Sequence, residues 1–158
     1  MNVIVMVDEN WGIGKDGDQL IYIAPDLKRF QALTMGHPIL LGRKTLATFP
    51  GGRPLKNRRN LILSTKKGFQ VEGGEVADSL EQVLAVAPED TFVVGGESVY
   101  RQLLPYCQRA YVTKVHQVFE VDCYFPNLDE DSEWKVLEEE GPLFHEGIRF
   151  SYVSYQRI

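Results

Sequence analysis

Short apolar runs bounded by polar or glycine-rich stretches recur along the first two thirds of the chain. They are rich in Val, Ile and Leu and occupy residues 3–7, 38–41, 60–64 and 91–94. Runs this short and this apolar are typical of strands that are buried on both faces of a sheet. The pattern predicts two further strands, at residues 73–77 and 110–115.

Helical spacing of apolar residues appears between these runs. Leu27 and Phe30 begin one such pattern, and Pro25 suits its first position, where a missing N–H is not needed. Gly36 suits the C-cap of this helix. Further helical segments are expected just after residue 45, at residues 79–87 and at residues 97–104.

The last third of the chain has a different pattern. Residues 134–136 and 148–155 alternate between apolar and polar, as strands of antiparallel hairpins do. Strand–helix alternation followed by such a hairpin predicts an α/β fold with a mostly parallel sheet and an antiparallel edge. Because no repeat, low-complexity tract or linker interrupts it, we expect one domain over residues 1–158.

Composition narrows the class of protein. The 158 residues are 44% hydrophobic and 25% charged, as in ordinary globular proteins. The formal net charge of −5 argues against a general nucleic-acid-binding surface. Cys107 and Cys123 lack metal-type or redox-type spacing, which favours reduced thiols in a cytosolic protein.

Three further features exclude other classes. His37, His116 and His145 are scattered, so no metal site is expected. The chain runs from Met1 straight into a strand-like segment that ends in acidic residues, so we expect no signal peptide. No apolar run approaches the roughly 20 residues that a membrane span needs.

One acid stands out in the first predicted helix. Asp26 lies in an otherwise apolar stretch and shares a helix face with Phe30, four residues later. This arrangement suits a flat, partly apolar ligand with a protonatable edge. An acid in a first helical turn also interacts favourably with the helix dipole, and most such acids have no other role.

Three strand ends carry residues suited to phosphate or to close backbone approach. In an open parallel sheet, ligands bind beyond the carboxyl ends of the strands. Residues 42–45 and 64–67 combine cations with hydroxyl groups, and Gly95–Gly96 precedes a helix. Each of the first two also fits a solvated basic turn. Neither a Walker A loop nor a full G-x-G-x-x-G motif is present.

Two further polar residues are candidates for ligand binding. Arg58 belongs to an arginine cluster just before a buried strand, where it could hold a carboxylate through two hydrogen bonds or remain a surface charge. Thr113, inside a strand, could bond a buried carboxylate or reflect only the strand preference of threonine.

Taken together, these segments resemble dihydrofolate reductase of the bacterial, NADPH-dependent type over nearly the whole chain. The resemblance is carried by residues 12–17, 25–30, 42–45, 53–55 with Arg58, 94–96 with Tyr100, 111–113 and 122–126. It implies an eight-stranded sheet with about four helices, NADPH as cofactor, and reduction of 7,8-dihydrofolate to tetrahydrofolate for one-carbon metabolism. It also implies a cytoplasmic monomer and antifolates such as methotrexate or trimethoprim as further ligands.

The resemblance also assigns the substrate site. Asp26 would be its only acid, binding the amidine edge of the pterin and promoting protonation of N5 through water. Arg58 would clamp the glutamate α-carboxylate, and Thr113 would hydrogen-bond Asp26. The implied substrate contacts are Ile4, Val5, Asp26, Leu27, Phe30, Phe49, Leu55, Arg58 and Thr113. Burial would raise the pKa of Asp26 and the helix N-terminus would lower it; the sequence leaves the balance open.

The cofactor site follows in the same way, with Arg43 and Thr65 nearest the 2′-phosphate and a cis bond between the paired glycines. The loop over residues 8–24 would close over the nicotinamide. The implied cofactor contacts are Val5, Ile13, Gly14, Gly17, Gly42, Arg43, Lys44, Thr45, Leu63, Ser64, Thr65, Lys66, Val94, Gly95, Gly96, Glu97, Ser98, Val99 and Tyr100.

This chain departs from the family pattern near the acid. Ile21 stands where a tryptophan is common, Tyr22 could substitute for it in part, and Ala24–Pro25 moves a proline by one position. Two rivals remain: a riboflavin-pathway reductase, against which Arg58 argues, and a non-catalytic nucleotide-binding module, against which Asp26 argues.

Overall fold

The computed structural model describes residues 1–158 and contains one large and one small sheet. The large sheet has the strand order β10-β11-β8-β1-β7-β4-β5-β6. Its strands are β1 (Asn2–Val7), β4 (Ile39–Gly42), β5 (Asn60–Leu63), β6 (Gly74–Ala77), β7 (Phe92–Gly95), β8 (Arg109–Val115), β10 (Trp134–His145) and β11 (Ile148–Arg157). The helices are α1 (Ala24–Thr34), α2 (Arg43–Leu46), α3 (Leu80–Val86) and α4 (Glu97–Leu103), with 3-10 turns η1 (Pro50–Gly52) and η2 (Leu104–Tyr106). None of these helices meets the length and apolarity needed to cross a membrane.

The six strands from β6 to β8 are parallel, and β11 runs antiparallel between β8 and β10. The prediction of a mostly parallel eight-stranded sheet with an antiparallel C-terminal edge is therefore confirmed. β10 is much longer than the predicted strand at residues 134–136. Register shifts after Val136 and after Glu140 break its alternation, so a period of two could not reveal its full length.

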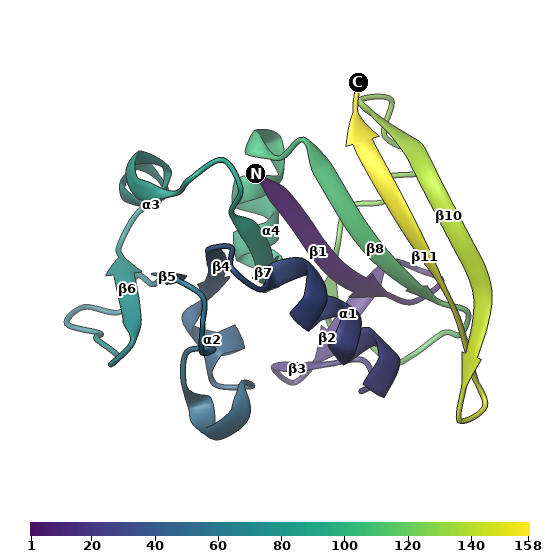
Figure 1. Ribbon diagram of the computed structural model, residues 1–158, viewed down its shortest axis with the longest axis horizontal. Helices are drawn as coiled ribbons and strands as arrows, with labels where there is room; N and C mark the ends of the chain where they lie inside the picture. The colour runs from purple at the N-terminus through teal and green to yellow at the C-terminus, as the bar shows by residue number, and fades with distance from the viewer.

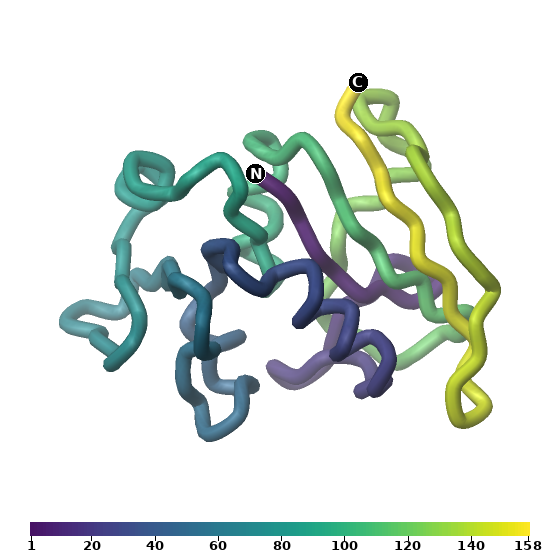
Figure 2. The backbone as a smooth tube through the Cα atoms, viewed as in Figure 1, coloured from purple at the N-terminus to yellow at the C-terminus, as the bar shows by residue number.

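Both faces of the sheet are covered, and the side chains of β1 show how. Val3, Val5 and Val7 point into a core that includes α3 and α4, whereas Ile4 points into a second core with Phe30 from α1. Figure 1 shows α1 crossing one face of the sheet and α4 on the other. Figure 2 shows both chain ends toward the top of the view, with the chain of β1 running downward from the N-terminus.

The sequence predicts a loop over residues 8–24. The structure places part of it in strands β2 (Gly12–Lys15) and β3 (Asp18–Gln19), which pair with β9 (Cys123–Tyr124) in the small sheet. These strands are short, and one of the two partners of β2, β9, lies far along the chain, so local sequence patterns carry little signal for them.

Asp8 ties the start of this segment to the chain that leads to β9. Its side chain is only 3% exposed. One oxygen accepts from the backbone N–H groups of Asn10 (2.9 Å) and Gly12 (2.8 Å), and the other accepts from Phe119 (3.0 Å). A buried carboxylate that accepts three backbone bonds leaves none of those amides without a partner.

We predict that Asp8→Asn lowers the free energy of unfolding by about 2–4 kcal/mol, because an amide NH₂ cannot accept and faces at least one buried backbone N–H. Urea unfolding at neutral pH measures this loss. Glu9→Gln is the matched control, because Glu9 is exposed and its side chain makes no hydrogen bond. Equal stabilities of the two variants would contradict the anchoring role.

Candidate active site

The first turn of α1 is fixed by apolar packing rather than by a capping side chain. The helix begins at Ala24, so Pro25 occupies its second position and not the predicted first one. The N-cap residue, Ile23, makes no capping hydrogen bond but is buried in a cluster with Val115 and Phe150. This contact holds the start of α1 against β8 and β11, which places Asp26 over the sheet.

The side chain of Asp26 is hydrogen-bonded to Thr113 on strand β8 of the sheet, as predicted. The Thr113 hydroxyl donates to Asp26 Oδ1 over 2.6 Å, and Thr113, on β8, is only 3% exposed. Burial raises the pKa of Asp26 above its ordinary value, whereas the hydrogen bond from Thr113 and the charge of Arg29 act to lower it. Burial therefore outweighs the groups that favour the charged form.

An apolar wall extends from Asp26 along the same face of the sheet. Ile4 and the partly buried Phe30, Phe49 and Leu55 belong to one cluster, and these are predicted substrate contacts. Leu27, which follows Asp26 on α1, remains 45% exposed. An exposed leucine on the same helix as a half-buried phenylalanine and a half-buried acid offers an apolar surface that a flat ring can cover.

Arg58 lies against the far part of α1. One of its Nη atoms donates to Gln31 Oε1 (2.6 Å) and to Thr34 Oγ1 (3.1 Å), and its Nε donates to the carbonyl of Lys56 (3.0 Å). No protein group accepts from the other Nη atom, which leaves donors available for a carboxylate. The sequence did not point to Gln31, since only the fold brings it to Arg58.

The carboxyl ends of β4 and β7 meet because these strands are neighbours. The peptide bond between Gly95 and Gly96 is cis, as the resemblance implied. A Cβ atom on Gly95 or Gly96 would lie 3.2 or 3.3 Å from Thr45 Oγ1, and Gly95 has a φ of 140°. The backbone of Gly95 therefore favours glycine, and a side chain on Gly96 would crowd Thr45. The two segments form a narrow cradle.

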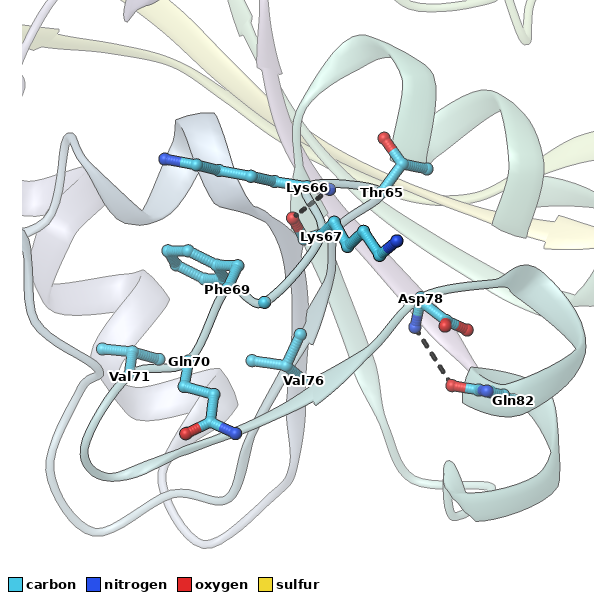
Figure 3. A pocket seen from close by; sticks show the side chains of 12 residues that line it. Thr65, Lys66, Lys67, Phe69, Gln70, Val71, Val76, Asp78 and Gln82 are labelled. Atoms are coloured by element: carbon cyan, nitrogen blue, oxygen red, sulfur yellow. Dashed lines mark hydrogen bonds between the residues drawn. The ribbon is translucent and has the colours of Figure 1, made fainter.

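A cavity of about 610 Å³ lies beyond the ends of β5 and β6. Ser64, Thr65, Lys66 and Lys67 line one part of it. Their predicted role in binding phosphate stays a prediction. Figure 3 shows Phe69, Val71 and Val76 grouped in the same pocket. The Arg43 guanidinium, on α2, lies 6.0 Å from the centre of the Phe69 ring, which lines this cavity. The apolar part was not predicted, because a loop without periodicity contributes Phe69 and Val71 and the short strand β6 contributes Val76.

Known proteins were compared with the chain. The profile of the family described as dihydrofolate reductase matches residues 1–157. The chain belongs to the dihydrofolate reductase family. The dihydrofolate reductase of Bacillus subtilis is 41% identical over 142 residues, covering 89% of this chain and 83% of that protein. That of Staphylococcus haemolyticus is 38% identical over 162 residues, covering 100% and 96%.

A solved structure agrees with this assignment. Dihydrofolate reductase from Enterococcus faecalis, complexed with NADP(H) and the compound RAB-propyl, superposes with a TM-score of 0.87. The two sequences are 34% identical, and the match covers 99% of this chain and 95% of that one. The predicted family and fold are therefore confirmed.

The other residues that the family resemblance assigns fall into two groups. Most lie at or just beyond the ends of β4, β5 and β7, namely Gly42, Lys44, Leu63, Val94, Glu97 and Ser98. Ile13 and Gly14 lie on β2 and Gly17 follows it; a Cβ on Gly14 would come within 2.2 Å of the Asp18 carbonyl oxygen. All of these assignments stay predictions.

Three assigned side chains point into the core. Val5 and Val99 are buried there, and the buried Tyr100 hydroxyl donates to the Ile4 carbonyl over 2.8 Å. Their predicted ligand contacts also stay predictions. Near the acid, Ile21 packs against the cluster around Ile23, whereas the exposed Tyr22 donates to Asp18 over 2.6 Å. The Tyr22 hydroxyl therefore points to Asp18, and its partial substitution for the tryptophan stays a prediction.

We predict that Asp26→Asn stabilises the ligand-free protein at neutral pH. Because the folded-state pKa of Asp26 is raised, its contribution to stability is full below the unfolded pKa and is lost as pH rises through the folded value. Urea unfolding of both proteins from pH 4 to pH 8 measures this, with exposed Glu130→Gln as control. The gain should grow with pH; a constant difference would contradict the raised pKa.

Proposed function

We propose that this protein reduces 7,8-dihydrofolate to tetrahydrofolate with NADPH, and so supplies tetrahydrofolate for one-carbon metabolism. The observation that carries the proposal is the carboxyl of Asp26, held by Thr113 beside an apolar wall in a chain of this family. The related Enterococcus faecalis enzyme was solved with NADP(H), which supports the choice of cofactor.

The residues on the cofactor side fit NADPH. In the cradle of Gly95, Gly96 and Thr45 the ends of β4 and β7 lie close together, which supports a site where the backbone of both strands meets the cofactor. The cavity beyond β5 and β6 combines Lys66 and hydroxyl groups with an apolar part. This combination suits a nucleotide that carries a phosphate.

Within this site, Arg43 and Thr65 would hold the 2′-phosphate that distinguishes NADPH from NADH, and the cradle would hold the middle of the cofactor. When bound, NADPH supplies the hydride that adds to the pterin.

Asp26 promotes the proton transfer that accompanies the hydride transfer. Because burial raises its pKa, a larger fraction of the carboxyl is protonated near neutral pH than in an exposed aspartate. The hydrogen bond from Thr113 occupies Oδ1 and leaves Oδ2 to face the amidine edge of the pterin. Through a water molecule, this group promotes protonation of N5 as the hydride arrives.

The remaining residues orient the substrate. The apolar wall with Phe30, Phe49 and Leu55 packs against the pterin and benzoyl rings and excludes water from the reacting atoms. Arg58, already held by Gln31 and Thr34, binds the glutamate α-carboxylate with its remaining donors. Antifolates such as methotrexate or trimethoprim would compete for the same surface.

We also propose that the chain acts as a single domain and a monomer in the cytoplasm. A single eight-stranded sheet that uses strands from both ends of the chain supports one domain. Cys107 and Cys123 are free thiols, which suits a reducing compartment.

The test of the function is NADPH consumption by the purified protein with dihydrofolate. NADH in place of NADPH and a methotrexate-blocked sample are the controls. We expect rapid, NADPH-preferring and inhibitor-sensitive oxidation. Binding of NADPH without turnover of dihydrofolate would reject the proposed reaction and direct attention to another pterin or pyrimidine substrate.

We predict that Asp26→Asn keeps NADPH binding but lowers turnover at pH 7 by about 100-fold or more, because general acid catalysis typically contributes that much. Activity should recover in part at low pH, where solvent protonates the substrate. Steady-state rates across the pH range and fluorescence titration of NADPH measure the two effects. Unchanged turnover near pH 7 would remove Asp26 from the mechanism.

We predict that Arg58→Leu weakens dihydrofolate binding by about 2–5 kcal/mol, the range for removing one partner of a buried charge pair. It should scarcely change the binding of a pterin that lacks the glutamate, because that ligand has no α-carboxylate to pair. Titration of both ligands measures the difference. Equal losses would refute the clamp and would favour a substrate other than a folate.

A further inference from the structure

Arg29 lies behind the catalytic acid on the same helix. It comes three residues after Asp26 on α1, so the two side chains are neighbours on the helix surface. Its guanidinium carbon lies 3.9 Å from the centre of the Tyr152 ring on β11. Tyr152 in turn is opposite Thr113 in the sheet, and Thr113 donates to Asp26. Arg29, Tyr152 and Thr113 therefore surround one side of the acid.

The charged and titratable groups around Arg29 come from every element packed there. Tyr152 lies on β11, Tyr111 on β8 and Glu140 on β10, where Glu140 is the register partner of Tyr152. A surface cavity of about 330 Å³ separates Arg29 from the acidic strand and is lined by Arg29, Glu138, Glu139, Glu140, Tyr152 and Ser154.

Stacking, rather than an ion pair, holds the guanidinium in place. Arg29 makes no salt bridge within 4.0 Å and no hydrogen bond to the protein, although it is partly buried. An arginine side chain keeps its charge in proteins. Its charge is thus not cancelled by a contact partner, and the nearest acid on its own helix is Asp26.

We propose that Arg29 is a positioning residue for the reaction: it acts through Asp26 and sets the pH range over which the enzyme delivers a proton to the substrate. This inference rests on the proposed function for its kinetic consequence, but the interaction of Arg29 with Asp26 is present without any ligand.

The physical reason is the opposition of two effects at one carboxyl. Burial favours the neutral acid, which can give a proton, and a nearby cation favours the carboxylate, which cannot. Arg29 acts to lower the pKa of Asp26 against the larger effect of burial. Removing the charge of Arg29 therefore raises the pKa of Asp26, so that the carboxyl stays protonated up to a higher pH.

Charge and packing can be separated by substitution. Arg29→Met removes the charge but keeps a long apolar stem over Tyr152, and Arg29→Lys keeps the charge. Lys28→Met is the matched control, because it removes an equal charge from the exposed neighbouring position on α1. All variants have the same helix length and differ little in helix propensity.

Two measurements follow for each variant. One is the pH midpoint above which hydride transfer falls, and the other is the titration of the Asp26 carboxyl carbon by nuclear magnetic resonance in the ligand-free protein. In Arg29→Met we expect both midpoints to rise by ~0.5 pH unit, about threefold in proton affinity, a modest value for a partly screened cation. Arg29→Lys and Lys28→Met should stay close to the unchanged protein.

The outcomes separate the two proposals. Unshifted midpoints in Arg29→Met, or equal shifts in Arg29→Lys, would overturn the role of Arg29 and leave a packing role. If Arg29→Met does not fold, Arg29→Gln takes its place with the same expectation. No turnover of dihydrofolate by the unchanged protein would reject the proposed function alone, because the carboxyl titration still tests Arg29.

Discussion

The hydrogen bond from Thr113 to Asp26 joins the first turn of α1 to the centre of the sheet, and the candidate site depends on it. Ile23 seats the helix start in an apolar cluster, so Asp26 has a defined place over β8. Phe30 on the same helix packs on the apolar wall with Ile4. One helix therefore carries the acid and part of the apolar wall, and its Gln31 and Thr34 side chains accept hydrogen bonds from Arg58, the proposed carboxylate clamp.

Around the acid, burial and charge act in opposite directions. Burial raises the pKa of Asp26, whereas Thr113 and Arg29 oppose that effect. An acid that serves proton transfer near neutral pH needs both burial and a favourable charge or hydrogen bond. Burial alone would keep the carboxyl neutral, and full exposure would leave it ionised. The Arg29 guanidinium stacks on the Tyr152 ring. This stacking keeps the cation near Asp26 without a contact ion pair.

The cofactor side depends on topology. Parallel pairing of β4, β5 and β7 brings three strand ends to one edge of the sheet. The strand ends were predictable, since apolar runs followed by glycine, hydroxyl and basic residues mark them in the sequence. The roles of Phe69 and Val76 were not predictable. Phe69 lies in a loop and Val76 in a short strand, and the cavity that they line exists only after folding. The pairing of β2 with β9 was equally hidden, since the two segments are far apart in sequence.

By itself, the sequence predicted the class of fold and the positions of most strands and helices, because local periodicity and residue types do not depend on distant contacts. The family, and the choice of Asp26, Arg58 and the paired glycines as candidate site residues, followed from the resemblance that the motifs carry. The tertiary structure alone decided the direction of the Asp26 pKa, the partners of Arg58 and the place of Arg29 behind the acid. Each depends on burial and on groups that only folding brings together, and electrostatic effects follow distance in space and local dielectric rather than position in the chain.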